Sequence, residues 1–428
     1  MRKAVGRIWR AISNSRLVLR LEELSATSMV QVQQKGDALS GARNGTHVLL
    51  AAPGNGNIGD QAMFEAFVRS VDGHVLVVVR AASDLLAIPS TRAADVEVMV
   101  LPDLLYGTTI PHLRDFRRLL KRLDDSRSLS VIGADIMDGA YNDRASIRRF
   151  RIPRLVSRLG LDTRILGFSW NDHPTPRARS AMIAASSVTT LLPREPRTAE
   201  RLTIDGALDV TTVADLAFLV TPSGRLAPDL NEWIEQQRAD ARQIVIVNAN
   251  HGLQRYTDQV DALVTVIQKG LERQSSFVLL PHDSRGKESD EVLARKIWDA
   301  VGQHPRVFLI PRVIMPADVA TLAGRADFAI TGRMHLAILA STVGTPAIAL
   351  SYQGKIEGLY RKLGLSSFIE PDSDLGANVW RQYLLVSENL ATNRATLQAN
   401  VGELKELARG NVRGLESEGV AGTIRAAR

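Results

Sequence analysis

From Thr46 onward the sequence alternates between short apolar runs and longer amphipathic stretches, and this alternation most constrains the fold. A short apolar run bounded by turn residues is typical of a buried strand, whereas apolar residues at helical spacing indicate a covering helix. Strands are expected over residues 47–52, 75–79, 96–101, 129–132, 164–168, 188–192 and 210–213, and then over 244–247, 277–280, 307–310, 328–330 and 347–350. Helices are expected between them, over residues 60–71, 112–123, 146–159, 258–269, 288–300 and 316–323. The pattern predicts parallel sheets with helices on both faces.

The chain has 428 residues, too many for one ordinary hydrophobic core. Pro222-Ser223-Gly224 interrupts the alternation, and a polar helical stretch over residues 226–242 follows before the second series of strands begins. We therefore expect a basic N-terminal helical extension at residues 1–45, α/β domains at residues 46–225 and 226–370, and C-terminal helices with a tail at residues 371–428. Two such domains would face a cleft, and ligands bind at the carboxyl ends of the strands in such sheets.

Composition excludes several classes of site and partner. The chain has no cysteine, which rules out disulfides, thiolate nucleophiles and cysteine–zinc sites. Its histidines form no HExxH or similar close pair, so no metal is expected. The net charge is +7, but aromatic residues are only 5% and no nucleic-acid-binding signature is present, so nucleic acid is not an expected partner. The lack of a spanning apolar run and of a signal peptide predicts a cytoplasmic protein. Nothing in the sequence indicates the oligomeric state.

Part of the positive charge lies in residues 1–20, which contain several Lys and Arg and no acid. Val5, Ile8, Trp9 and Ile12 fall at helical spacing within this stretch. A basic amphipathic helix of this kind can lie on an anionic membrane, which would allow peripheral contact with the inner face of a membrane. The same pattern also fits a helix packed on its own domain or a frayed tail.

The segment from Thr331 to Lys355 carries the most informative charges. The strand 328–330 runs into a turn, and Arg333 and His335 then fall in the first turn of an expected helix. Unpaired N–H groups at a helix start favour an anion. A fixed cation and an imidazole at that position indicate a small anionic ligand and proton transfer, whereas either residue alone would fit a surface arginine or a buried histidine.

Two loops rich in glycine and aspartate follow strands of the first half. Glycines between Ala52 and Asp60 let the backbone approach a ligand, but their spacing matches neither the dinucleotide fingerprint nor the P-loop. Asn57 could bind hydroxyl groups or shape the turn, and Asp60 could contact a substrate or cap the next helix. Asp135 and Asp138 could orient hydroxyl groups or cap turns.

Other strand ends carry isolated candidates. Trp170 could stack on a sugar face or belong to the core. Arg194 suits a carboxylate or phosphate because its guanidinium is a planar fork of donors, although a lone arginine is more often a surface residue. His282-Asp283 and Asn250-His251 follow strands of the second half, and both are interpreted as loop-shaping residues.

Taken in order, these pieces resemble the polysaccharide pyruvyl transferase family from about His47 to Gly364. The matching elements are N-x-G-D at residues 57–60, the GAD-x-x-DG loop at residues 133–139, Arg194 after its strand, and R-M-H at residues 333–335 followed by G-T-P and Y-x-x-K. The resemblance implies two Rossmann-like parallel-sheet domains of the glycosyltransferase-B kind, with N- and C-terminal helical extensions. The basic segment before Thr46 and the C-terminal helices lie outside the matching region.

The resemblance implies transfer of pyruvate from phosphoenolpyruvate to sugar hydroxyls of a glycan or glycolipid, commonly as a ketal, with no cofactor. Carried over by position, Arg194, Arg333 and Lys355 would hold the donor, and His335 would be the acid/base. The first domain would then be the acceptor side and the second the donor side. Two arginines and a lysine can balance the carboxylate and phosphate. Histidine can transfer protons near neutral pH.

Two other functions fit the same architecture, because fold alone does not determine function. A nucleotide-sugar glycosyltransferase often uses a carboxylate to hold ribose hydroxyls, and Glu357 follows Lys355, but that loop is cationic where a nucleoside needs a neutral pocket. A non-catalytic sugar-binding or membrane-surface protein would most simply have lost His335 or the cations, and all of them are present.

Overall fold

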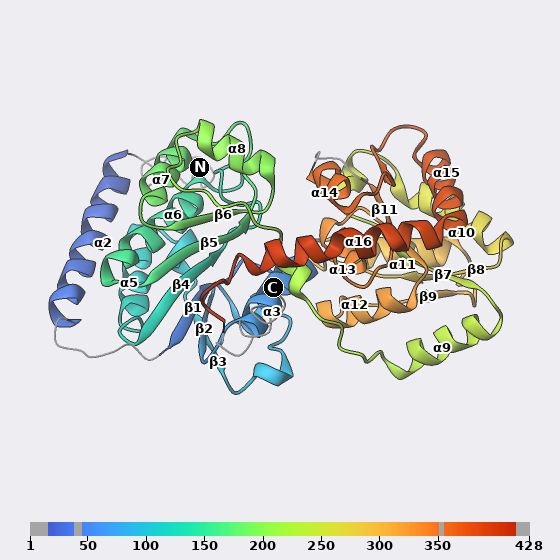
Figure 1. Ribbon diagram of the computed structural model, residues 1–428, viewed down its shortest axis with the longest axis horizontal. Coiled ribbons are helices and arrows are strands. Elements are labelled where there is room, and N and C mark those ends of the chain that lie inside the picture. Colours follow the sequence, from blue (N-terminus) through green and yellow to red (C-terminus); the bar gives the residue numbers. More distant parts are fainter. Residues whose placement is uncertain (1–15, 38–44, 351–354, 417–428) are drawn as a thin grey trace, which may run out of the picture.

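The computed structural model describes residues 16–37, 45–350 and 355–416, which form two α/β units arranged along the long axis (Figure 1). The first unit contains a six-stranded parallel sheet with the order β3-β2-β1-β4-β5-β6. Its strands are β1 (Thr46–Leu50), β2 (Val75–Val79), β3 (Val96–Val100), β4 (Ser126–Ile132), β5 (Asp162–Phe168) and β6 (Thr190–Pro193). Its helices are α3 (Ile58–Ser70), α4 (Asp103–Tyr106), α5 (Thr109–Leu120), α6 (Asp143–Val156), α7 (Pro176–Ser186) and α8 (Pro196–Ile204).

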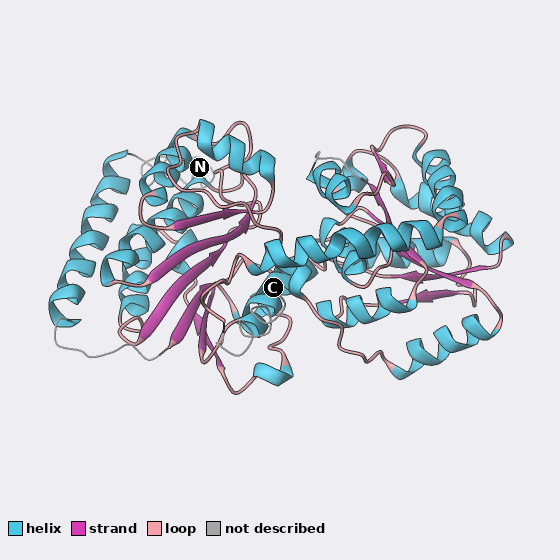
Figure 2. Ribbon diagram, viewed as in Figure 1, coloured by secondary structure: helices cyan, strands magenta, loops and turns pink. Residues whose placement is uncertain are grey.

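The second unit repeats the architecture with the order β12-β11-β10-β7-β8-β9, again all parallel. Its strands are β7 (Gln243–Asn248), β8 (Ser275–Leu279), β9 (Val307–Leu309), β10 (Phe328–Thr331), β11 (Ala347–Leu350) and β12 (Phe368–Ile369). The helices are α9 (Pro228–Ala239), α10 (Gln259–Glu272), α11 (Asp290–Ala300), α12 (Pro316–Arg325), α13 (Met334–Thr342), α14 (Lys355–Leu363), α15 (Leu375–Glu388) and α16 (Leu390–Arg409). Figure 2 shows helices on both faces of each sheet.

Alternate strand residues enter different cores because successive side chains point to opposite faces of a sheet. In β1, Val48 and Leu50 pack with α5 and α6, whereas Leu49 packs with α3. In β7, Ile244 and Ile246 join the same apolar cluster as Leu49, and this cluster continues through α12, α13 and α16. One hydrophobic core therefore connects the two units.

The chain passes between the units at two places. The 3-10 helix η4 (Leu216–Leu219) contacts α3, α13 and α16 between them, and α16 runs across the second unit back toward the first (Figure 1). After α16, Asn411 accepts a hydrogen bond from the Gly167 backbone N–H at 2.9 Å and donates one to the Ala214 carbonyl at 2.9 Å. The C-terminal helix thus ends against the first sheet.

The N-terminal helix α2 (Arg16–Asp37) packs on the outside of the first unit. Its inner face buries Glu22, Ala26 and Val30, whereas Leu17, Leu21 and Leu24 are exposed on the other side. The predicted amphipathic stretch at residues 1–20 lies mostly outside the described residues, which begin at Arg16. Among the described residues, none of the helices has the length and apolar character needed to cross a bilayer.

The expected fold class is confirmed: two parallel-sheet units are flanked by N- and C-terminal helices. One expected strand was wrong. Residues 210–213 follow β6 through hydrogen bonds from Thr211 N–H to the Leu191 carbonyl and from Val213 N–H to the Pro193 carbonyl, but only an isolated bridge forms, at Val210. Strand β12 was missed because only two of its residues pair with the sheet.

Candidate functional site

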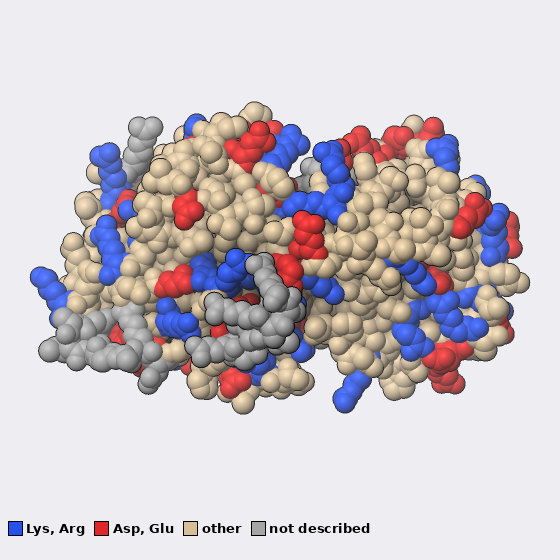
Figure 3. All heavy atoms as spheres, viewed as in Figure 1, with Lys and Arg blue, Asp and Glu red and all other residues tan. Residues whose placement is uncertain are grey.

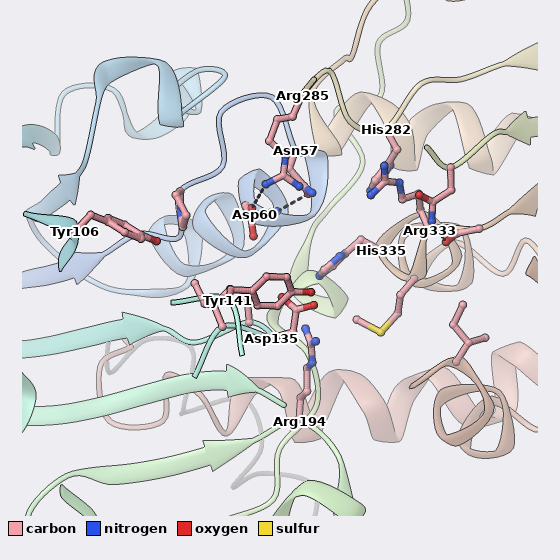
Figure 4. A pocket seen from close by; sticks show the side chains of 17 residues that line it. Asn57, Asp60, Tyr106, Asp135, Tyr141, Arg194, His282, Arg285, Arg333 and His335 are labelled. Atoms are coloured by element: carbon pink, nitrogen blue, oxygen red, sulfur yellow. Dashed lines mark hydrogen bonds and ion pairs between the residues drawn. The ribbon is translucent and has the colours of Figure 1, made fainter. Parts of the chain in front are cut away.

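A cavity of about 420 Å³ lies between the two units, at the carboxyl ends of their strands. Its lining residues follow β1, β3, β4 and β6 on one side and β7, β8, β10 and β11 on the other. They are Pro53, Asn57, Asp60, Tyr106, Ala134, Asp135, Ile136, Tyr141, Arg194, Asn250, His282, Arg285, Gly332, Arg333, Met334, His335 and Ile356. Figure 4 shows His335 between Asp135 and Arg194 on one side and Arg333 on the other.

His335 projects into this cavity from the first turn of α13. Its Nε2 lies 3.4 Å from Oδ2 of Asp215, the residue that caps η4. The ring packs so closely on α3 that a Cβ added at Gly59 would lie 2.2 Å from His335 Nδ1. Gly59, the glycine of the N-x-G-D element, therefore leaves the space that the imidazole from the other unit occupies.

Arg194 and Asp215 form a buried ion pair behind the histidine. Arg194 Nη1 donates to Asp215 Oδ2 at 2.7 Å, and its Nε donates to the Ser169 hydroxyl at 3.0 Å. Burial by itself would raise the pKa of the Asp215 carboxyl, but His335 and Arg194 outweigh that effect and hold the pKa below its ordinary value. An ionised Asp215 can orient His335 and stabilise its protonated form.

Arg333 is held from behind by carboxylates that follow β8. Its Nε and Nη2 donate to the two oxygens of Asp290 at 3.0 Å and 2.7 Å, a bidentate arrangement, and Nη1 lies 3.4 Å from Asp283 Oδ2. His251 Nδ1 lies 2.8 Å from Arg333 Nη2. Burial raises the pKa of Asp290, but Arg333 and His251 hold it below its ordinary value. The guanidinium is thus fixed in orientation at the cavity wall.

Asp60 faces the cavity from the first turn of α3. Arg285 Nη1 lies 3.9 Å from its carboxylate, and Arg285 Nη2 donates to Asp283 Oδ2 at 2.7 Å. Burial raises the pKa of Asp60 to about 6, although Arg285 and His335 oppose the increase. This carboxyl can therefore change protonation state close to neutral pH.

The loops of the two units are joined directly above the cavity. Asn57 and Asp283 form an antiparallel bridge, and Ile58 N–H donates to the His282 carbonyl at 3.0 Å. The Asn57 carboxamide oxygen caps α3 by accepting from the N–H groups of Gly59 and Asp60, and its NH₂ donates to Asp283. Of the two roles considered for Asp60, the helix cap is excluded, because α3 begins at Ile58 and the capping oxygen comes from the residue before it, Asn57.

The structure brings most of the sequence candidates together: Asn57, Asp60, Asp135, Arg194, Arg333 and His335 all line the cavity. Asp138 does not line it; its carboxylate accepts hydrogen bonds from the Ala140 N–H and the Asn171 side chain. Trp170 is buried in the core of the first unit, where its indole N–H donates to Asp205. Lys355 begins α14, and its side chain lies outside what the structure describes.

Sequence reasoning missed the partners of these residues. Asp215 and Asp290 are far from His335 and Arg333 in the chain, and the stretch before Asp215 was read as a strand. Arg285 follows the His282-Asp283 pair, which was interpreted only as a loop. The signal that could have found Arg285 and Asp290 is that both follow β8, in or just after the loop at its carboxyl end, whereas Asp215 follows no strand directly and caps η4. In the described part of the chain, no group of three or more His, Asp or Glu side chains could hold a metal ion.

The comparisons with known proteins bear on both family and fold. A family model described as polysaccharide pyruvyl transferase matches residues 57–354, and a search of curated proteins gave no match. Among solved structures, the chain is similar to UDP-GlcNAc 2-epimerase from Neisseria meningitidis, with 11% identity, coverage of 86% of this chain and 98% of that one, and a TM-score of 0.57.

Two further solved structures have the same two-unit fold. The corresponding epimerase from Methanocaldococcus jannaschii has 10% identity, coverage of 79% and 91%, and a TM-score of 0.53. WaaG, a glycosyltransferase involved in lipopolysaccharide biosynthesis, has 14% identity, coverage of 85% and 98%, and a TM-score of 0.52. At this identity the likeness concerns the fold alone.

Proposed function

Because the chain belongs to the polysaccharide pyruvyl transferase family, we propose that it moves pyruvate from phosphoenolpyruvate to sugar hydroxyls of a glycan or glycolipid as a ketal. The observation that carries this proposal is the placement of His335 with Arg194 and Arg333 in one cavity. Such a cavity can hold a compact anion beside an acid/base group. The residues that line the cavity come from both units, so one ligand can contact donor-side and acceptor-side residues together.

The donor's charge is recognised by the arginines. Arg333 is oriented by Asp290 and Arg194 by Asp215, so neither side chain has to be ordered when the ligand binds. The backbone N–H groups at the start of α13 add a partial positive charge beside them. Lys355 is proposed as a third cation by its position in the family motif alone.

His335 is the proposed acid/base. Ketal formation breaks the bond between the enol carbon and the phosphate oxygen, and forms bonds from two sugar oxygens to that carbon. One hydroxyl proton is delivered to the methylene carbon, which becomes a methyl group, and the other leaves with hydrogen phosphate. His335 can move these protons because Asp215, 3.4 Å away, stabilises the imidazolium that forms between the transfers.

The acceptor is proposed to bind on the first-unit side of the cavity. Asp60 and Asp135 line this side, and Tyr141 lies there with an exposed ring that could stack on a sugar face. Asp60, with a pKa raised to about 6, can accept or donate a hydrogen bond to a hydroxyl near neutral pH. Asn57 is committed to the α3 cap and to Asp283, so its role is to hold the loop.

Helix α2 is proposed to bring the enzyme to a membrane-bound acceptor. Leu17, Leu21 and Leu24 form an exposed apolar stripe directly after the basic residues 1–15, a combination that suits an anionic lipid surface. Co-sedimentation with phosphatidylglycerol vesicles, and not with phosphatidylcholine vesicles, is expected, and Leu21→Glu should abolish it. The proposal would be contradicted if the wild type sedimented equally with both kinds of vesicle. It would also be contradicted if Leu21→Glu sedimented with phosphatidylglycerol vesicles as the wild type does.

The proposed function is tested by phosphate release from phosphoenolpyruvate in the presence of a panel of acceptor glycans, with mass spectrometry of the products. A pyruvylated glycan that forms with the wild type and not with His335→Gln is the expected result. Transfer of a sugar from a nucleotide-sugar donor by the same preparation, with no use of phosphoenolpyruvate, would contradict it. Glu357, the residue on which that alternative depends, pairs with Arg361 and does not line this cavity.

A further inference from the structure

His282 is the most deeply buried titratable group of the cavity that the mechanism above does not use. It follows β8 and is 1% exposed, yet it belongs to the cavity lining. Its carbonyl accepts the hydrogen bond from Ile58 N–H at the start of α3. Figure 4 shows its side chain beside that of Arg333. The ring is therefore fixed at the contact between the two units.

Neither ring nitrogen of His282 has a hydrogen-bond partner among the residues that the structure describes. A buried polar group without a partner costs free energy, and most such groups in folded proteins are paired. His112, which is equally buried, shows the usual case: its Nδ1 lies 2.6 Å from the Leu104 carbonyl and its Nε2 lies 3.6 Å from Glu22. Because His282 lines a cavity and His112 does not, this difference indicates that the hydrogen-bond partner of His282 is a ligand bound in the cavity.

The surroundings of His282 favour the uncharged imidazole. Burial first, and then the nearby positive charges of Arg333 and His335, hold its pKa well below the ordinary value, while Asp290 opposes the decrease only weakly. An uncharged imidazole offers one N–H donor and one acceptor. Beside a cation that balances the charge of an anion, such a ring can add a directed hydrogen bond without adding further charge.

We propose that His282 is a donor-binding residue whose ring N–H donates a hydrogen bond to an anionic oxygen of phosphoenolpyruvate. This inference rests on the proposed function. Its consequence is a link between ligand binding and the contact of the two units, because the backbone of the same residue is bonded to α3 and the neighbouring Asp283 is bonded to Asn57. A donor held by His282 and Arg333 would stabilise the closed arrangement of these loops.

The test compares His282→Phe with His112→Phe, using thermal unfolding without ligand and calorimetric titration with phosphoenolpyruvate. His282→Phe removes two unpaired nitrogens and should unfold at or above the wild-type temperature, because an apolar ring of similar shape carries no unmet hydrogen bond. Its affinity for phosphoenolpyruvate should fall roughly 10- to 100-fold, as expected for a hydrogen bond to a charged group. His112→Phe should unfold at a lower temperature and bind phosphoenolpyruvate as the wild type does.

A His282→Phe protein that binds phosphoenolpyruvate as tightly as the wild type overturns this inference and leaves the proposed function standing. A wild type that does not bind phosphoenolpyruvate overturns both. Should His282→Phe fail to fold, His282→Leu, which also lacks a hydrogen-bond donor, decides the question by the same titration, with weakened binding expected and unchanged binding contradicting the inference.

Discussion

Two clusters of buried charges in this molecule have similar compositions and different hydrogen bonding. One lies under α2, where Arg148 donates to both carboxylate oxygens of Glu22 at 2.9 Å and 2.7 Å. The other lies in the cavity between the units, where Arg194 and His335 meet Asp215. Each contains arginine, a carboxylate and a histidine, and the central arginine and carboxylate of each are buried.

In the cluster under α2, the side chains of Arg148, Glu22 and His112 pair with one another or with backbone carbonyls. Arg148 Nη1 also donates to the carbonyls of Leu105 and Gly107, and His112 contacts the Leu104 carbonyl. In the cavity, both ring nitrogens of His282 have no hydrogen-bond partner among the described residues. Buried charge is therefore not by itself a sign of function, whereas unused hydrogen-bonding capacity that faces a cavity is.

The same lesson applies to the protein surface. On the face shown in Figure 3, Lys and Arg side chains are scattered among Asp and Glu over both units. On this face the positive side chains are therefore interspersed with negative ones, and exposed ion pairs contribute little to stability. In the proposed function, recognition of the anionic donor depends on the arginines that buried carboxylates hold in place inside the cavity.

The largest expected effect is on catalysis. His335→Gln should lower turnover by about 100- to 10,000-fold, the usual contribution of general acid–base groups, while phosphoenolpyruvate still binds. Steady-state phosphate release and calorimetric titration measure the two quantities, with the exposed His173→Gln as control. Turnover within a few-fold of wild type would remove His335 from the mechanism.

Substitutions in the cluster under α2 should lower the stability of the protein and leave its turnover unchanged. Arg148→Met leaves Glu22 buried without its main partner, and the free energy of unfolding should fall by about 3–5 kcal/mol, measured by urea denaturation. Turnover per folded molecule should not change. Arg122→Met, which breaks an exposed pair with Glu97, is the matched control with an expected loss below about 1 kcal/mol. A similar loss in both variants would show that the buried pair has no special role.

Gly59 tests the contact between the units at the cavity. In Gly59→Ala the new methyl group would lie 2.2 Å from His335 Nδ1, so the imidazole must shift, and misplacement of a catalytic group by about 1 Å can cost roughly 100-fold in rate. Turnover should fall by about that factor. Ala in place of Gly favours the helix itself, so a stable variant with full turnover would show that the His335 position is not critical.

The smallest effect concerns pH and Asp60. Its pKa is raised by burial to about 6 in the folded protein, above the ordinary value of 3.8, so ionisation of Asp60 destabilises the fold as pH rises through this range. Asp60→Asn should be more stable than wild type by roughly 1–3 kcal/mol above pH 6, and the difference should vanish below about pH 4. Urea denaturation at several pH values measures it, and a constant difference at every pH would exclude this carboxyl as the cause.

The sequence predicted the fold and the location of the candidate site better than it predicted which side chains pair with one another inside that site. Strand and helix periods are local properties, and the rule that strand carboxyl ends meet at one edge brought Asp60, Asp135, Arg194, Arg333 and His335 together correctly in one cavity. The partners Asp215 and Asp290 depend on how two units dock, which no local pattern encodes. The strand predicted at residues 210–213 was wrong for a related reason. Tertiary contacts place this apolar run beside β6, but it forms only an isolated bridge with that strand.

The difference between the two clusters can be observed directly by nuclear magnetic resonance of protein labelled with ¹⁵N in its histidine rings. Saturation with phosphoenolpyruvate is predicted to shift the ring resonances of His282 and His335 and to leave those of His112 unchanged. Ring resonances of His282 and His335 that stay unchanged at saturating phosphoenolpyruvate would contradict the assignment of the cavity as the donor site.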